Sequence, residues 1–339
     1  MRARNRLLSW GWGALLAAVL VSTIIAAICL GAADIRPADV LASVAAHLGF
    51  GEATLSPLRD GIVWELRLPR VLTAAAVGAG LAISGAVMQA ITRNPLADPY
   101  LLGLSAGASL GAVTVLIIGV SVLLPIAAFG GALAALVATL LLASAAGPLS
   151  PTRTVLAGVA VSALAAALTS FVIFWSAKGD SFREILNWLL GSLAGANWQA
   201  VVISVGALVV VGVPVLLAGR LLDGFAFGDS AAAALGINVT GARWVLLVFT
   251  ALLTGAMVSV SGSIGFIGLV LPHAVRLMVA ARHRVLLPLV ALLGAIVLVW
   301  ADTIARTVFD PRELPVGIVT AILGAPVFAV LLARRRSST

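Results

Sequence analysis

Residues 67–104 read RLPRVLTAAAVGAGLAISGAVMQAITRNPLADPYLLGL, and the order of residue types in this stretch identifies the class of protein. Two arginines precede an uncharged Gly- and Ala-rich span, a turn containing Pro95 and Pro99 follows, and a second apolar span begins. A helix needs about 20 mostly apolar residues to cross the hydrocarbon core of a bilayer. The stretch therefore predicts two membrane-embedded helices, with arginines at one end and a rigid turn at the other.

The composition of the whole chain supports the same class. Of 339 residues, 62% are hydrophobic and 10% are charged. A water-soluble shell of this size cannot cover so much apolar surface, so lipid must act as solvent. The expected fold is an all-α polytopic membrane protein, with a single transmembrane domain over residues 1–339 and no soluble domain.

Apolar runs of spanning length recur along the chain. The run that begins at Val245 stays uncharged to Val275, which is longer than one helix needs but short for two. We divide it at Ser261-Gly262-Ser263, because the topology argument below requires an even number of crossings. The expected spans lie near residues 10–30, 71–91, 100–118, 123–145, 155–175, 201–218, 245–271 as two helices, 286–300 and 316–332.

Charge predicts the orientation. Arginines at 2, 4 and 6 and at 334–336 should stay in the cytoplasm under the positive-inside bias. With ten helices, the cytoplasmic side holds 13 of the 21 Lys/Arg and 3 of the 13 Asp/Glu, leaving 8 and 10 outside. Both termini are therefore expected in the cytoplasm. The basic residues are interpreted as a topology signal at the lipid surface, with no nucleic-acid partner.

Several function classes lack the residues they need. No chain of Asp/Glu crosses the bilayer, which argues against ion-coupled transport, and no G-x-x-x-x-G-K-[ST] motif is present to bind ATP. Cys29 is the only cysteine, and His273 beside Pro272 is interpreted as a packing group, since a metal site needs several convergent ligands. We expect no catalytic residue, no metal site and no cofactor on this chain. A stand-alone secondary transporter or channel stays open as the alternative, and a membrane enzyme fits worst.

Small residues and capped turns are expected to shape the helices. Glycines at 78, 80 and 85, and at 103, 107 and 111, form stripes that let helices approach closely in lipid. Asn94 before Pro95, and Asp98 before Pro99, can each cap a helix whose first residue is proline.

The connection at about 219–244 contains a short helix outside the membrane. Asp229 is the expected N-cap, an alanine-rich turn follows, and Gly236 is the expected stop. Taken alone, such a helix can be an interfacial segment or a docking element.

Arg67 and Arg70 lie three positions apart at a helix entrance, with Pro69 between them. There they can face acidic groups of a partner. They can equally snorkel to lipid headgroups or pair with Glu65 and Asp60.

Seven segments in order carry a resemblance to a known family: RLPR at 67–70, SGAVMQ at 84–89, NPLADPYLLGLSAGA at 94–108, LNWLLGSLAGANW at 186–198, ALGINV at 234–239, SGSIGFIGLVLPHAVRL at 261–277 and ELPVGIVTAILGAPVF at 313–328. Each is weak alone in a Gly/Ala-rich chain, but the ordered set is specific. Together they resemble the FecCD family of permeases, the membrane subunits of type II ABC importers for iron chelates, haem and cobalamin.

The resemblance implies a set of partners. These are a second permease copy, two cytoplasmic ATPase subunits that bind ATP and Mg, and an extracytoplasmic substrate-binding protein. It implies localisation in the bacterial inner membrane, and iron(III)-siderophore as the expected cargo, with haem and cobalamin as alternatives. The second copy can be identical or a paralogous permease.

The resemblance also assigns roles to residues. The short helix becomes the element that couples to the ATPases, and three arginines become the docking site for acidic groups of the binding protein. Asp302 lies four residues before Arg306, so an intrahelical pair is also available, and both uses of Arg306 can coexist. The fifth and tenth helices line the translocation path, and the turn before the fifth forms an inner gate. The residues so assigned are Asp229, Ala231, Ala234, Leu235 and Gly236 for coupling; Arg67, Arg70 and Arg306 for docking; Ala157, Gly158, Ser162, Ala165, Ala166 and Thr320 for the path; and Pro148, Ser150 and Arg153 for the gate.

Overall fold

The computed structural model describes residues 2–31, 33–51, 55–145, 147, 150–176, 179–279 and 282–336, and within these ranges every regular element is a helix. In chain order they are α1 (Arg2–Cys29), α2 (Pro37–His47), α3 (Pro57–Gly61), η1 (Ile62–Arg67), α4 (Leu68–Thr92), η2 (Pro99–Leu102), α5 (Leu104–Ile118), η3 (Ser121–Leu123), α6 (Leu124–Ala145), α7 (Pro151–Ser176), α8 (Gly179–Leu189), α9 (Trp198–Ala207), η4 (Leu208–Gly212), α10 (Val213–Leu217), α11 (Gly219–Ala226), α12 (Asp229–Ala234), α13 (Val239–Ser261), α14 (Ile267–Met278), α15 (His283–Thr307) and α16 (Val316–Arg336).

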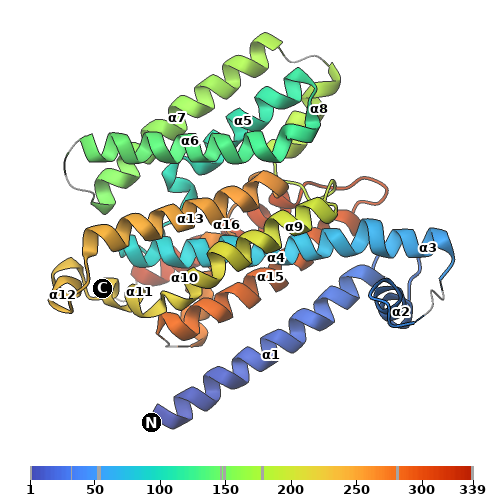
Figure 1. Ribbon diagram of the computed structural model, residues 1–339, viewed down its shortest axis with the longest axis horizontal. Coiled ribbons are helices and arrows are strands. Elements are labelled where there is room, and N and C mark those ends of the chain that lie inside the picture. The colour runs from blue at the N-terminus through green and yellow to red at the C-terminus, as the bar shows by residue number, and fades with distance from the viewer. Residues whose placement is uncertain are drawn as a thin grey trace.

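Ten of the apolar segments match the predicted crossings. Seven are long and apolar enough to cross a membrane, and three shorter apolar helices, α5, α14 and Val316–Val330 of α16, make up the rest. The long helices run roughly side by side, so the bundle has two ends (Figure 1). The end that carries α11 and α12 is called the α12 end below, and the end that carries α2 and α3 is called the α2 end.

Helix α4 lies at the centre of the bundle, in contact with α15, α13, α14 and α9. Its glycines make these contacts close. A Cβ added to Gly78 would lie 2.2 Å from the carbonyl oxygen of Gly294, and one added to Gly85 would lie 1.9 Å from that of Gly268. The predicted role of the glycine stripe in packing is confirmed, because only hydrogen side chains leave room for these backbones.

The long uncharged run from 245 is broken where it was predicted to break. Helix α13 ends at Ser261, Gly262 has φ of 67°, and α14 begins at Ile267. The Ser261 carbonyl accepts a hydrogen bond of 2.9 Å from the N–H of Ser192. A neighbouring loop thus stabilises the non-helical backbone between the two helices.

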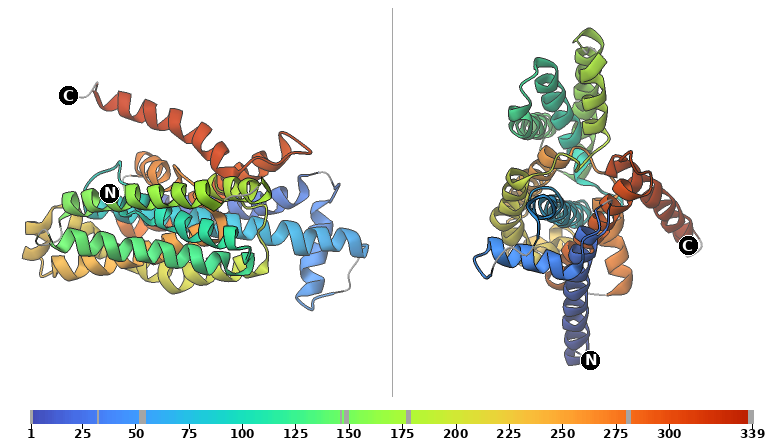
Figure 2. Two further views of the ribbon diagram at one scale, coloured as in Figure 1. Left: turned by 90° about the horizontal axis from the view of Figure 1, so that it is seen from above. Right: turned by 90° about the vertical axis from the view of Figure 1, so that its right-hand side faces the viewer.

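Helices α5, α6 and α7 pack together on one side of the bundle, while α1 and α16 diverge from it (Figure 2). Glycine again allows two helices, here α5 and α6, to approach closely, since a Cβ on Gly107 would lie 2.3 Å from the carbonyl oxygen of Gly131. The outer faces are apolar, as expected for surfaces that meet lipid or another membrane subunit. Exposed side chains there include Val137, Leu141, Leu156, Phe171, Phe174, Ile322 and Leu323.

The turn between α4 and α5 is capped as predicted at one of its two prolines. The Asp98 carboxylate accepts a hydrogen bond of 2.8 Å from the N–H of Tyr100, and Pro99 begins η2. Burial raises the pKa of Asp98 to about 6. The expectation for Pro95 is wrong: Asn94 accepts from the N–H of Leu96 within a turn, and no helix begins there.

Candidate docking sites at the two ends of the bundle

Helix α11 is anchored to the transmembrane core at the α12 end. Leu222 and Phe225 are completely buried. Asp223 accepts hydrogen bonds from the backbone N–H of His283 at 2.9 Å and lies 2.8 Å from its Nδ1. A carboxylate at the N-terminus of α15 is favourable because the helix dipole is positive there. The segment before α12 is therefore tied to one long helix.

Helix α12 is the short helix predicted outside the membrane, and it projects at its end of the bundle (Figure 1). Ala234, Leu235 and Gly236 are exposed, whereas Ala231 is half-buried. Gly236, with φ of 81°, ends the helix as predicted. These residues form a small protruding surface, defined as Ala231 and Ala233–Gly236 and called the coupling surface after its predicted role.

The predicted N-cap of α12 is wrong by one residue. Gly228 occupies the cap with φ of 95° and ψ of 165°, and Asp229 is the first helical residue. The Asp229 carboxylate instead pairs with Arg243 of α13, with Nη2 at 2.8 Å and 3.0 Å from its two oxygens. Because the Arg243 side chain is buried, this ion pair links α12 firmly to α13.

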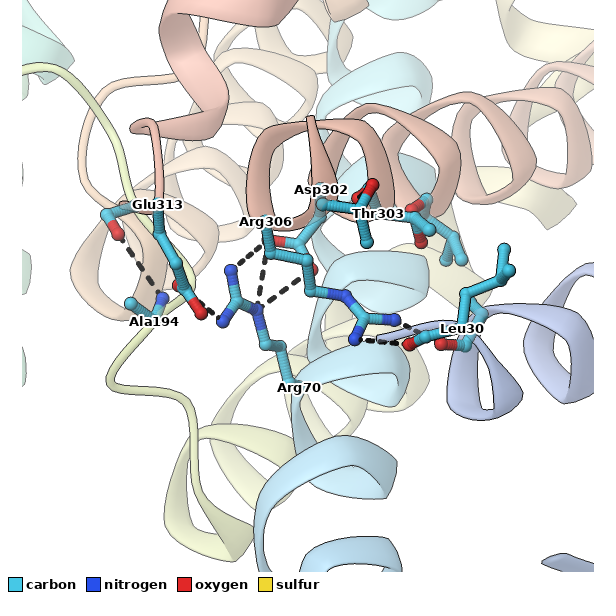
Figure 3. A network of polar contacts seen from close by, with 11 residues as sticks. Leu30, Arg70, Ala194, Asp302, Thr303, Arg306 and Glu313 are labelled. Atoms are coloured by element: carbon cyan, nitrogen blue, oxygen red, sulfur yellow. Dashed lines mark hydrogen bonds and ion pairs between the residues drawn. The ribbon is translucent and has the colours of Figure 1, made fainter. Parts of the chain in front are cut away.

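Two of the predicted docking arginines hold α1 at the α2 end. Arg67 is 8% exposed, and its Nη1 donates to the carbonyl of Ile28 at 2.7 Å. Arg306 donates to the carbonyls of Ala27 and Leu30 (Figure 3). These carbonyls have no partner within the helix, and arginine is well suited to cap them.

Arg70, the third of the predicted docking arginines, binds two carboxylates (Figure 3). Its Nε lies 2.9 Å from Oδ2 of Asp302 and its Nη2 lies 2.9 Å from Oδ1, while Nη1 donates to Glu313 at 2.8 Å. The intrahelical pairing of Asp302 with Arg306 is therefore corrected: Asp302 binds Arg70, and Arg306 turns to α1. Of the alternative partners, Asp60 accepts from Ser43 at 2.5 Å, and among the described residues Glu65 forms no ion pair with Arg67 or Arg70.

A polar contact that the sequence analysis missed lies between α4 and α14. Pro272 has no N–H for the Gly268 carbonyl, and Nε2 of Gln89 donates to that oxygen at 3.3 Å and to Leu269 at 3.0 Å. The amide oxygen of Gln89 accepts from Arg276. The sequence signals for this contact were Gln89 inside one apolar span and, in another, Pro272 with Arg276 four residues later.

The predicted path residues on α7 are mostly inside the protomer. Ala157 and Ala165 are each 6% exposed, and a Cβ on Gly158 would lie 1.9 Å from the carbonyl oxygen of Leu101. Within the protomer these small residues pack against α5 and η2, and the role of α7 in a translocation path stays a prediction. Ser162 is half-buried and Ala166 is exposed. The exposed face of α7 carries larger side chains, among them Leu156, Val159, Leu164, Leu168 and Phe174.

The remaining predicted positions lie in separate places. Thr320 of α16 is 4% exposed and donates to the carbonyl of Gly317 at 3.1 Å. Of the predicted gate residues, Pro148 lies outside the described residues, Ser150 accepts from the N–H of Arg153 at 3.3 Å, and Arg153 is exposed.

Across the described part of the chain, no group of three or more His, Cys, Asp or Glu is placed to hold a metal ion.

Comparisons with known proteins agree on one family. The model of the FecCD transport family matches residues 18–334. The chain is 40% identical to the uncharacterized ABC transporter permease protein YvrB of Bacillus subtilis, over 93% of this chain and 91% of the relative. It is 43% identical to the vitamin B12 import system permease protein BtuC of Vibrio cholerae, over 86% and 90%. It is 44% identical to the cobalamin import system permease protein BtuC of Halobacterium salinarum, over 86% and 78%.

A solved structure shares the fold throughout. This is an ABC transporter described as of metal-chelate type, in an inward-facing conformation, with a TM-score of 0.84 and 30% identity over 97% of this chain and 99% of that one.

Proposed function

The chain belongs to the FecCD transport family, a family of ABC importer permeases, and on this premise we propose that it carries cobalamin or a related corrinoid across the bacterial inner membrane. The observation that carries the cargo proposal is the similarity over 86% of this chain, at 43–44% identity, to two permeases named for vitamin B12 or cobalamin import. An iron chelate is the second candidate, favoured by the likeness to the metal-chelate type transporter.

The proposed orientation places the α12 end in the cytoplasm. Arginines gather at this end, at 93, 220, 282 and 284, which agrees with the positive-inside bias. The α2 end, with Arg67, Arg70 and Arg306, then faces the extracytoplasmic side. Both termini would lie in the cytoplasm, as the sequence predicts.

In the proposed mechanism, ATPase subunits dock on the coupling surface and their motion drives alternating access. Two contacts support this. Asp229 ties α12 to α13 through Arg243, and Asp223 ties α11 to the first residue of α15. Force applied to α12 thus reaches two helices that run the length of the bundle, and packed helices shift as units rather than deforming continuously.

A second permease copy would complete the path. The exposed apolar faces of α7 and α16 leave room for such a copy, because an apolar helix face can pack against another membrane subunit in place of lipid. Capture of cargo would belong to an extracytoplasmic binding protein that docks through acidic groups at the α2 end. Complementary charge of this kind fixes register and speeds encounter more than it adds affinity.

Uptake of labelled cargo in a strain lacking its own cobalamin permease tests the proposal. The chain is expressed with its cognate ATPase and binding protein, and uptake of radiolabelled cobalamin, an iron(III)-siderophore and haem is compared. We expect ATP-dependent uptake of cobalamin. Uptake of an iron chelate alone would reassign the cargo, and transport in liposomes under an ion gradient with no ATPase would favour a stand-alone transporter.

A substitution pair tests the coupling surface. Leu235 at the α12 end and Leu48 at the α2 end are 70% and 61% exposed, so serine should cost little stability at either position. We expect Leu235→Ser to reduce both ATPase association and uptake, and Leu48→Ser to leave ATPase association unchanged. Normal uptake by Leu235→Ser would contradict the assignment of α12.

A further inference from the structure

We propose that Glu313 is an internal competitor for the docking site: an acidic side chain of the extracytoplasmic partner replaces Glu313 on Arg70, and the exchange releases the connection that leads into α16. The inference rests on the proposed function, because it takes the α2 end as the docking face. The exchange identifies Glu313 as a residue of this chain that limits docking. It also links docking to α16, a helix of the proposed translocation path.

Arg70 is already engaged by two carboxylates of this chain, and its side chain is only 12% exposed. Its Nε and Nη2 face the two oxygens of Asp302, and its Nη1 donates to Glu313 (Figure 3). A guanidinium binds carboxylates through fixed donor directions rather than as a point charge. A partner carboxylate therefore takes one of these donor positions only when the resident carboxylate leaves it.

Burial shows which of the two can leave. The side chain of Asp302 is 2% exposed, whereas that of Glu313 is 44% exposed. Moving Asp302 away would leave a buried charge without its partner, which is strongly unfavourable. Moving Glu313 away returns a carboxylate to water, and exposed ion pairs contribute little. Exchange at Glu313 is the easier event.

The charge of the cluster favours an acidic partner even before exchange. Arg67, Arg70 and Arg306 supply three positive charges, and Asp302 and Glu313 supply two negative ones, so these five side chains have a net charge of +1. Departure of Glu313 raises this net charge to +2. A carboxylate from the partner restores it.

Glu313 lies where its release affects α16. It belongs to the connection between α15, which ends at Thr307, and α16, which begins at Val316. This connection is also held by the Leu314 N–H on the Ala305 carbonyl at 2.9 Å, and Gly317 donates to the Gly191 carbonyl at 3.2 Å. Arg70 is therefore a side-chain tie between the central helix α4 and the start of α16. Partner binding would remove that tie and leave the backbone contacts.

The test measures the affinity of the labelled cognate binding protein for the complete transporter. Glu313→Gln removes the competitor and one negative charge, and Glu65→Gln is the matched control, since Glu65 is also exposed and lies five residues before Arg70. We expect Glu313→Gln to tighten binding by about three- to fivefold, the most that releasing an exposed ion pair allows, and Glu65→Gln by less than about twofold. Arg70→Ala should weaken binding, and adding Glu313→Gln to it should restore nothing.

The outcomes separate the two proposals. If Arg70→Ala leaves affinity unchanged, docking at this cluster is wrong, and the exchange fails with it. If Arg70→Ala weakens binding but Glu313→Gln tightens it no more than Glu65→Gln does, docking stands and the exchange is overturned. Thermal unfolding of each variant complex verifies that affinity is compared between folded proteins.

Discussion

Replacing Asp302 with alanine should lower the thermal stability of this protein more than any change at its half-exposed neighbour Glu313. Asp302 accepts from Arg70 at 2.9–3.1 Å, and the two side chains are only 2% and 12% exposed. The variant leaves the Arg70 guanidinium largely buried, with Glu313 as its remaining carboxylate.

The magnitude follows from the burial of the pair. Removing one member of a buried ion pair costs about 3–5 kcal/mol. Since Glu313 still neutralises Arg70 in part, the lower end of this range, about 3 kcal/mol, is expected. For a chain of this length each kcal/mol corresponds to roughly 2 °C, so the apparent Tm should fall by about 6 °C.

The assay is thermal unfolding of the detergent-solubilised protein at one fixed scan rate, because membrane proteins often unfold irreversibly. Glu313→Gln is the control and should lower the Tm by about 2 °C at most, since exposed pairs contribute about 0–1 kcal/mol. The double replacement of Arg70 by methionine and Asp302 by leucine should recover most of the loss, because an apolar pair leaves no charge buried. An Asp302→Ala variant as stable as Glu313→Gln, or a double variant as unstable as Asp302→Ala, would refute the reasoning.

Three further predictions concern packing, protonation and the buried glutamine. Gly85→Ala should prevent a monodisperse peak in size-exclusion chromatography, because its Cβ would lie 1.9 Å from the Gly268 carbonyl oxygen, whereas Gly130→Ala, with open space around it, should behave as the parent. Asp98→Asn keeps an acceptor for Tyr100 but removes a carboxyl whose pKa is raised by burial to about 6. A raised folded-state pKa contributes stability at low pH that is lost as the pH rises through it, so the variant should exceed the parent by up to about 3 kcal/mol at pH 7.5 and lose this advantage below about pH 4. Gln89→Leu should cost about 2–3 kcal/mol in thermal unfolding, since it leaves Arg276 and the Gly268 carbonyl without the amide that binds both. Gln199→Leu, at an exposed position of α9, is its control and should be neutral.

Features with a strong local signal could be predicted from the sequence. Apolar length predicts ten apolar segments because a helix that crosses lipid needs such a run, and the positive-inside bias at the two termini predicts the division of the run from 245 at Ser261-Gly262-Ser263, where α13 ends. The stop of α12 at Gly236 is equally local, since glycine readily adopts the positive φ found there. Composition and motif order therefore identify the class and the family.

Partner choice could not be predicted in the same way. The spacing in the sequence predicts an ion pair between Asp302 and Arg306. In the structure Asp302 instead pairs with Arg70, 232 residues away along the chain. The burial of Gly158 is likewise decided in space: the family resemblance implies a place on a translocation path, and close packing of α7 on η2 buries this residue within the protomer. In an apolar, Gly-rich chain the faces of a helix have similar compositions. Which face becomes buried depends on which neighbouring helix can approach it closely enough. Long-range contacts of this kind exist only once the helices are assembled, which is why the arrangement in space, rather than the order of residues, assigned each arginine its carbonyl or carboxylate.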